Sequence, residues 1–147
     1  MHKLLIANRG EIACRIARTA RRLGLEVAGV HSSADASARH VREIGESLRL
    51  GGPTAAESYL DIEAVVGAAL RCGADAVHPG YGFLSENAAF ARAVEAAGLV
   101  FVGPRPETLE RLGGKAIAEA EARRPGMPGV PGSEGALDDA AAVAAPV

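Results

Sequence analysis

The segment that decides the fold reads His78-Pro79-Gly80-Tyr81-Gly82-Phe83-Leu84-Ser85-Glu86-Asn87. It follows residues 74–77, a short apolar run typical of a buried strand, and it precedes residues 88–97, which are expected to form a helix closed by Gly98. Pro79 biases His78 towards extended backbone, so we expect the strand to end there. Ligands of open α/β sheets bind at the carboxyl ends of the strands. The segment is therefore expected at the carboxyl edge of the sheet, where it could contact a ligand.

The residue types inside this segment suit a loop that leads into a helix. Gly80 and Gly82 allow positive φ angles and a close approach of another group to the backbone. Ser85 and Asn87 are both suitable N-caps for the helix that follows.

Around the segment, expected strands alternate with expected helices. Strand 3–7, helix 11–23 and strand 26–31 form a strand-helix-strand unit, which predicts parallel strands and a right-handed crossover. Further strands are expected at 47–50, 74–77 and 99–102, and further helices at 37–43, 62–72, 88–97, 107–112 and 115–124. This alternation predicts an α/β fold in which helices flank a parallel sheet of about four or five strands.

Composition narrows the class of protein. The 147 residues carry a net charge of −2, which argues against a mainly electrostatic nucleic-acid role. No apolar run is long enough to span a bilayer, and the start is too short in apolar residues for a signal peptide, so we expect a cytoplasmic protein. Cys14 and Cys72 lie outside metal-ligand spacing and are interpreted as small buried thiols inside helices.

A tight turn, Asn8-Arg9-Gly10-Glu11, follows the first expected strand. It holds one glycine where a dinucleotide-binding site has three, so an NAD site is disfavoured. Arg9 and Glu11 are instead expected to form structural ion pairs and caps.

Several segments in one register resemble biotin carboxylase, the ATP-dependent component of acetyl-CoA, propionyl-CoA, methylcrotonyl-CoA and pyruvate carboxylases. They are Ile6-Ala7-Asn8-Arg9-Gly10-Glu11-Ile12-Ala13, His31-Ser32-Ser33-Ala34-Asp35, the segment 78–87, Phe101-Val102-Gly103-Pro104, Gly113-Gly114-Lys115 and Val130-Pro131-Gly132-Ser133. The resemblance covers nearly the whole chain.

The resemblance implies a Rossmann-like parallel sheet flanked by helices, the N-terminal pre-ATP-grasp domain, at residues 1–125. Residues 126–147 would be a linker and the truncated start of the ATP-grasp region. The complete enzyme uses ATP, Mg²⁺ and biotin to carboxylate biotin on a carrier protein with bicarbonate. We expect no catalytic residue and no metal ligand in this chain, no tightly bound cofactor, and no activity of the chain alone.

The resemblance carries over two functional positions, and two further residues are candidates because of their place in the loop. Lys115 matches a lysine that contacts ATP, although Gly114 stands where the family has Asp or Ser. Tyr81 matches an aromatic residue near biotin, with packing on the domain edge as the alternative. His78 and Glu86 lie in the same loop as substrate-site candidates, and structural hydrogen bonds explain them equally well.

The implied partners are the remaining biotin carboxylase domains, the biotin carboxyl carrier protein and the carboxyltransferase. A homodimer is also implied, because Arg18 matches a position near the family's dimer interface, although Arg22 replaces the acidic partner position. Two alternatives stay open: a non-catalytic module that dimerises or binds partners, and the N-domain of another ATP-grasp ligase, such as carbamoyl-phosphate synthetase or a purine-pathway enzyme.

Overall fold

The computed structural model describes residues 1–112, and the account below concerns the compact unit Met1–Pro106. In chain order the elements are β1 (Lys3–Ile6), α1 (Gly10–Arg22), β2 (Glu26–His31), the 3₁₀ helix η1 (Ser33–Asp35), α2 (Arg39–Ile44), β3 (Ser47–Arg49), α3 (Ile62–Arg71), β4 (Ala76–His78), α4 (Ala88–Ala96), β5 (Val100–Phe101) and α5 (Pro106–Leu112). The expected helix 115–124, the domain boundary at 125, the linker and tail 126–147, and Lys115 lie outside the described residues.

All five strands form one parallel sheet in the order β3-β2-β1-β4-β5. The first strand is central: Leu4 is aligned with Val27 of β2 on one side and with Ala76 of β4 on the other. The chain therefore winds outward from β1 in both directions, which confirms the predicted α/β parallel sheet.

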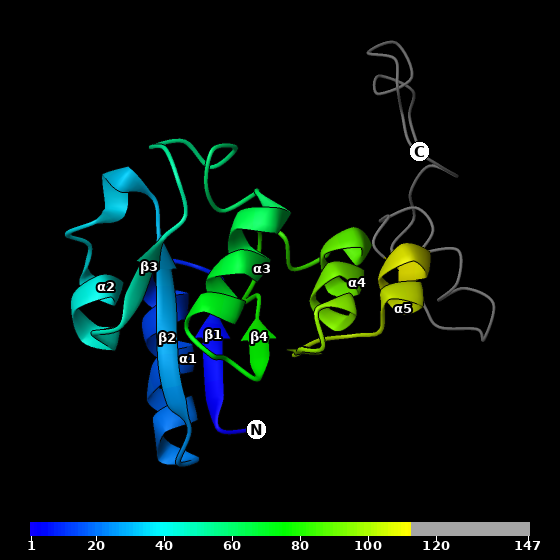
Figure 1. Ribbon diagram of the computed structural model, residues 1–147, viewed down its shortest axis with the longest axis horizontal. Coiled ribbons are helices and arrows are strands. Elements are labelled where there is room, and N and C mark those ends of the chain that lie inside the picture. Colours follow the sequence, from blue (N-terminus) through cyan, green and yellow to red (C-terminus); the bar gives the residue numbers. More distant parts are fainter. Residues whose placement is uncertain (113–147) are drawn as a thin grey trace, which may run out of the picture. The chain divides into compact units, whose positions relative to one another are not determined.

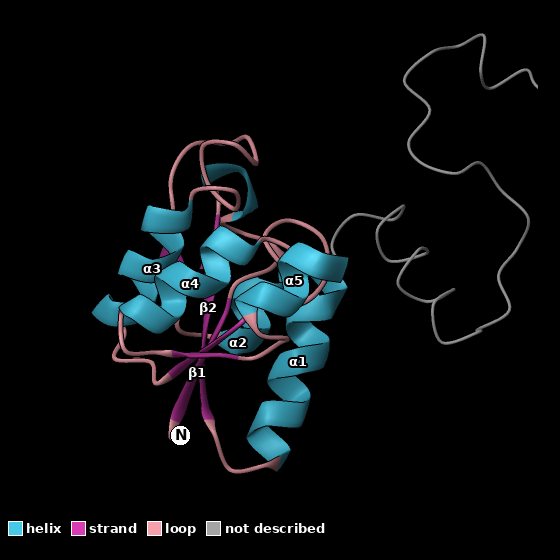
Figure 2. Cartoon of the chain, turned by 90° about the vertical axis from the view of Figure 1, so that its right-hand side faces the viewer, coloured by secondary structure: helices cyan, strands magenta, loops and turns pink. Residues whose placement is uncertain are grey.

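Helices cover both faces of the sheet. Figure 1 shows β1 to β4 running upward in parallel, and Figure 2 shows α1 and α2 on one side of the sheet with α3 and α4 on the other. This three-layer arrangement buries both faces, as parallel sheets require.

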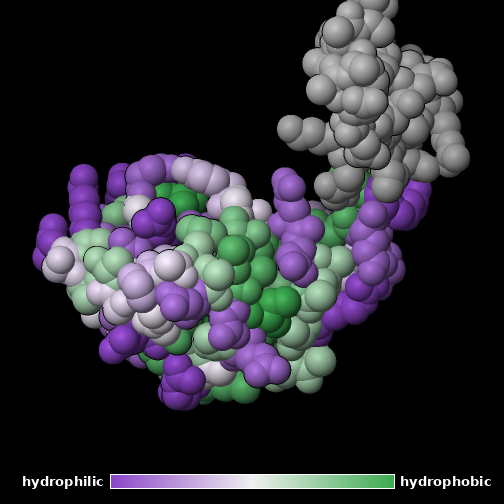
Figure 3. Space-filling view, turned by 90° about the horizontal axis from the view of Figure 1, so that it is seen from above, coloured by the Kyte–Doolittle hydropathy of each residue, from purple (hydrophilic) through white to green (hydrophobic). Residues whose placement is uncertain are grey.

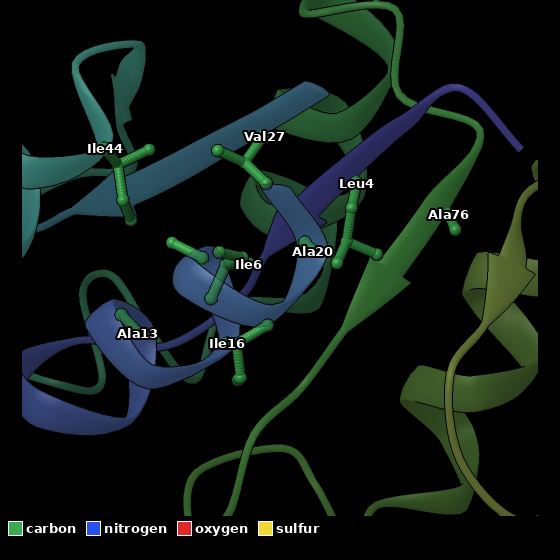
Figure 4. Close-up of a cluster of buried hydrophobic side chains, with 9 residues drawn as sticks. Leu4, Ile6, Ala13, Ile16, Ala20, Val27, Ile44 and Ala76 are labelled. Carbon is green, nitrogen blue, oxygen red and sulfur yellow. The ribbon is translucent and has the colours of Figure 1, made fainter. Parts of the chain in front are cut away.

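The core between the sheet and α1 is built from alternate strand residues. Leu4 and Ile6 of β1 point towards α1, where they meet Ile16 and Ala20 (Figure 4). The intervening Leu5 is completely buried and, by strand alternation, faces the α3 and α4 side. Small residues on α1 let the helix lie close to the sheet.

Two helix starts follow from side-chain caps. Asp61 caps α3 by accepting a hydrogen bond from the backbone N–H of Ala64, and Asn87 caps α4 by accepting one from Phe90. Of the two caps proposed for α4, Asn87 is therefore the one used. The helix ends at Gly24, Gly73 and Gly98 all have positive φ, as expected for residues just after a helix.

Two expectations about burial need correction. The apolar run 99–102 is typical of a buried strand, but β5 is a two-residue edge strand and Val100 is 52% exposed. Cys72 was expected inside a helix, but it is the C-cap residue of α3 and only partly buried, with its thiol donating to the carbonyl of Ala69. Cys14 is buried in α1 as expected.

Two absences concern residues 1–112 alone. None of their helices combines the length and apolarity needed to cross a membrane. Within the same residues, no three His, Cys, Asp or Glu side chains gather closely enough to hold a metal ion.

Candidate functional site

The carboxyl ends of β1, β2 and β4 bring three loops together. Ile6 is aligned with His78, so the turn after β1 lies beside the start of segment 78–87, and the backbone N–H of Ala7 donates to the carbonyl of His78 at 2.9 Å. Figure 3 looks down on this edge and shows both hydrophilic and hydrophobic side chains on its surface. The segment therefore lies at the carboxyl edge, as predicted.

Asn8 joins two of these loops. Its amide nitrogen donates to the carbonyl oxygens of Pro79 at 2.7 Å and Tyr81 at 2.8 Å, and its Oδ1 accepts from the backbone N–H of Arg9 at 2.8 Å. The residue is only 3% exposed. A buried amide with its donors and acceptor used in this way fixes the geometry of the groups around it.

Gly80 makes this arrangement possible. Its φ is +68°, and a Cβ at this position would lie 2.7 Å from Nδ2 of Asn8. Its backbone N–H donates to Nδ1 of His78 at 3.0 Å, so His78 closes the turn as an acceptor. Burial lowers the pKa of the His78 imidazole, which favours the neutral ring that this contact needs.

Tyr81 projects from the loop and is 60% exposed. Its hydroxyl donates to Oε1 of Glu11 at 2.6 Å, and this hydrogen bond raises the pKa of the phenol. Glu11 lies in the first turn of α1, where the helix dipole favours a carboxylate. The aromatic ring of Tyr81 is thus accessible to solvent, while its hydroxyl is fixed by the hydrogen bond to Glu11.

A second cluster adjoins the first through Arg9. The guanidinium of Arg9 pairs with Asp35 at 3.3 Å and lies 5.8 Å from the ring centres of Tyr59 and Phe83. These two rings stack with their centres 4.9 Å apart. Phe83 adopts a positive φ of 45°, which is unusual for a non-glycine residue. The expected structural ion pair of Arg9 is confirmed. Glu11 instead accepts a hydrogen bond from Tyr81, and no side-chain hydrogen bond caps the start of α1.

Hydrogen bonds tune the acid groups of this cluster. Burial alone would raise the pKa of the Asp35 carboxyl, but donors from Tyr59 and Ser32 and the charge of Arg9 outweigh it, so that pKa lies below its ordinary value. Burial and the hydrogen bond to Asp35 raise the pKa of Tyr59 to about 12. At neutral pH the pair is a carboxylate with a neutral phenol donor.

The other proposed substrate-site residues are placed differently. His78 also lines a largely apolar groove of about 610 Å³ beside α1, together with Leu4, Ile12 and Val102 among others. Glu86 is exposed near the end of the loop, shortly before α4. On the outer surface of α1, Arg15, Arg18 and Arg22 line a basic hollow.

Residues 1–109 match the family described as biotin carboxylase, N-terminal domain. The chain belongs to this family. Over 139 residues it is 53% identical to the mitochondrial methylcrotonoyl-CoA carboxylase subunit alpha of Oryza sativa subsp. japonica, which covers 95% of this chain and 19% of that protein.

Two solved biotin carboxylase domains have the same fold. That of a single-chain bacterial carboxylase superposes with a TM-score of 0.85 at 49% identity, covering 98% of this chain and 33% of the other. The second is the biotin carboxylase domain of the 2-oxoglutarate carboxylase of Hydrogenobacter thermophilus, a dimer in complex with MgADP, ADP and bicarbonate. Its TM-score is also 0.85, at 42% identity, and the match covers 96% of this chain and 31% of that one. The chain therefore spans about a third or less of the proteins it matches.

Sequence reasoning missed most of the hydrogen-bond network of this biotin carboxylase N-terminal domain. Asn8 and Asp35 lie inside segments that carry the family resemblance, but no local pattern gives them, or Tyr59, a role of their own. The contacts of Asn8 with Pro79 and Tyr81, and of Tyr59 with Asp35, join residues 24 to 73 positions apart, so no local pattern reveals them. The polar residue type of Asn8 directly after an apolar strand was the available signal.

Proposed function

We propose that this chain serves as the N-terminal domain of a biotin carboxylase, in which ATP and bicarbonate carboxylate biotin. In that reaction ATP is cleaved to ADP and phosphate, and the carboxyl carbon of bicarbonate becomes bonded to a biotin nitrogen. We assign this chain the binding and positioning of biotin through segment 78–87, and nucleotide contact through Lys115. The partners are the remaining biotin carboxylase domains, the carrier protein and the carboxyltransferase, in the cytoplasm.

One observation carries the biotin side of the proposal. Tyr81 is an exposed ring on a loop whose backbone is fixed by a buried amide, at the sheet edge where ligands of this fold class bind. An exposed aromatic face on a rigid support suits the apolar, sulfur-containing ring of biotin.

The test is a chimera in which this chain replaces the matching segment of the single-chain bacterial biotin carboxylase domain. We expect ADP release that requires both bicarbonate and free biotin. Tyr81→Ala should raise KM for biotin and leave KM for ATP unchanged. A folded chimera without biotin-dependent ADP release would contradict the proposal and favour the non-catalytic module.

The same chimera tests Lys115, which lies outside the described residues. Loss of a charge-assisted hydrogen bond costs about 1.5–3 kcal/mol, so Lys115→Ala should lower kcat/KM for ATP roughly ten- to a hundredfold. Lys3→Ala is a suitable control, because Lys3 pairs with Glu46. Equal ATP kinetics in wild type and Lys115→Ala would make Lys115 an ordinary surface lysine.

Assembly through α1 also stays a proposal. Arg15, Arg18 and Arg22 concentrate positive charge on one exposed surface of the helix. A symmetric contact between two such surfaces needs acidic groups from elsewhere in the partner. Sedimentation of the chimera with and without Arg18→Glu would test it, and an unchanged dimer would exclude Arg18 from the interface.

A further inference from the structure

Tyr81 is held at two separate points by residues from the turn after β1. The first is its backbone: the carbonyl oxygen accepts a 2.8 Å hydrogen bond from Nδ2 of Asn8. The second is its side chain: the hydroxyl donates to Glu11 at 2.6 Å. Asn8 and Glu11 lie only three positions apart, whereas Tyr81 is 73 and 70 positions away from them.

Asn8 is chemically suited to the backbone contact. Its two amide hydrogens serve two carbonyls of the same loop, those of Pro79 and Tyr81, and the residue is almost fully buried. Aspartate would have the same shape but would present an oxygen to both carbonyl oxygens. The position thus needs a double donor, and a carboxylate there would repel the loop.

Glu11 is suited to the side-chain contact. Because the phenol of Tyr81 is exposed, nothing but this hydrogen bond in the described contacts ties its hydroxyl to a particular direction. A short contact to a carboxylate is the stronger kind of hydrogen bond, and it selects one orientation of the ring. Glutamine would keep the shape and lose the charge.

We infer that Asn8 and Glu11 are positioning residues for Tyr81, with Asn8 fixing the loop backbone and Glu11 fixing the direction of the ring. The catalytic use of this positioning rests on the proposed function, in which the Tyr81 ring contacts biotin. A ring that is already oriented loses less conformational freedom when the substrate binds, so binding is stronger.

The first test uses the full chain and no enzymatic activity. Amide hydrogen exchange is measured for wild type, Asn8→Asp and the control Asn87→Asp, which keeps an acceptor at its cap. We expect Asn8→Asp to speed exchange at Gly80 and Ser85, whose N–H groups are bonded within the loop, by roughly tenfold or more, as expected for losing hydrogen bonds worth about 1 kcal/mol each. Strand amides such as that of Leu5 should be unaffected. Unchanged exchange in the loop would overturn the role of Asn8.

Asn8→Asp could instead unfold the chain as a whole. Asn8→Ala removes both donors without adding repulsion, and it is measured alongside. Loop exchange that stays at the wild-type rate in a folded Asn8→Ala variant would overturn the role of Asn8 in the same way.

The second test reads the phenol directly. The chain has two tyrosines and no tryptophan, so a Tyr59→Phe background leaves Tyr81 as the single titrating phenol in the ultraviolet spectrum. Glu11→Gln should move the pKa of Tyr81 down towards its ordinary value, because the carboxylate contact raises it. Glu63→Gln, a change in the first turn of α3, should not. Identical titrations for Glu11→Gln and its parent would overturn the role of Glu11.

The third test separates this inference from the proposed function. In the chimera, Asn8→Ala and Glu11→Gln should each raise KM for free biotin roughly two- to tenfold, the range for a hydrogen bond of about 0.5–1.5 kcal/mol, with KM for ATP unchanged. If Tyr81→Ala raises KM for biotin and these variants do not, the positioning inference fails. If none of the three changes KM for biotin while the exchange and titration shifts are seen, the positioning stands and the biotin role of Tyr81 fails.

Discussion

The hydroxyl of Tyr59 lies 2.7 Å from Oδ2 of Asp35 and donates a hydrogen bond to it. The same hydroxyl accepts from the backbone N–H of Ser32 at 3.1 Å, in a site where Tyr59 is only 3% exposed. One oxygen thus joins the loop before α3 to the loop after β2, and this network beside Arg9 supports the candidate site.

Tyr59→Phe should destabilise the fold. The change leaves a buried N–H and a carboxylate each short of one partner, a loss of about 1–3 kcal/mol. Urea unfolding followed by circular dichroism measures it. Tyr81→Phe is the matched control, because its hydroxyl is exposed, and it should shift the midpoint much less. Equal midpoints for the two variants would contradict the assigned importance of the network.

Alkaline pH should weaken the same network. The pKa of Tyr59 is about 12 in the folded protein against an ordinary value of 10.0. A raised pKa means that the folded state keeps its proton longer than the unfolded chain does. The stabilisation is therefore complete below pH 10 and is lost as pH rises towards 12, by roughly 2–3 kcal/mol at 1.36 kcal/mol per pKa unit. Tyr59→Phe should not show this part of the loss of stability at alkaline pH. If the free energy of unfolding falls equally with pH in wild type and Tyr59→Phe, Tyr59 is not the group responsible.

Acid should act through His78. Burial lowers the pKa of His78 below its ordinary 6.5, so the unfolded chain takes up a proton before the folded protein does. Stability from this residue is full above pH 6.5 and falls as the pH drops through the folded value. His78→Asn offers an acceptor to the N–H of Gly80 without titrating, so its stability should change less between pH 7 and pH 5. A pKa of His78 above 6.5, measured by NMR titration of the folded protein, would contradict the prediction.

Two glycines of one loop should differ in their tolerance of alanine. Gly80 and Gly82 have nearly equal φ values of 68° and 66°, so the backbone cost of about 1–2 kcal/mol is common to both. A Cβ at Gly80 would also clash with Asn8, whereas one at Gly82 meets nothing within 4 Å. Gly80→Ala should therefore be clearly more destabilising in thermal unfolding, and equal losses would show that Asn8 moves aside.

The helix α4 should depend on Asn87 and not on Ser85. Only Asn87 accepts from the N–H of Phe90, and losing such a cap costs about 1 kcal/mol. Asn87→Ala should lower the melting temperature, while Ser85→Ala should lower it by less. Asn87→Asp keeps the acceptor and should be close to wild type, and a large loss there would point to a role other than capping.

Much of the fold could be predicted because its signals are local. Apolar runs gave the strands, the glycines at 24, 73 and 98 gave the helix ends, and Pro79 gave the end of β4. Segment 78–87 could be placed at the carboxyl edge because parallel strands share that edge. Several motifs in one register predicted membership of the biotin carboxylase family, and the match of residues 1–109 to its N-terminal domain confirms it.

What could not be predicted depends on position in space. The exposure of Val100 follows from β5 being at the edge of the sheet, which the residue type does not reveal. Stacking of Tyr59 on Phe83 joins residues that the sequence keeps apart. The choice of Asn87 over Ser85 depends on where the helical backbone of α4 begins, because the cap is the side chain that accepts from the N–H of Phe90. The contact of Lys115 with ATP stays a prediction.

The central position of β1 has a consequence for the order of folding during synthesis. Leu4 finds its β2 partner only 23 residues later, but its β4 partner 72 residues later. Closing the longer loop costs about 1 kcal/mol more in chain entropy. While the chain emerges from the ribosome, β1, α1 and β2 can pair first, and one side of β1 stays open until Ala76–His78 has been made. The buried amide of Asn8 can then engage the loop only as β4 pairs with β1, before β5 is added at the edge.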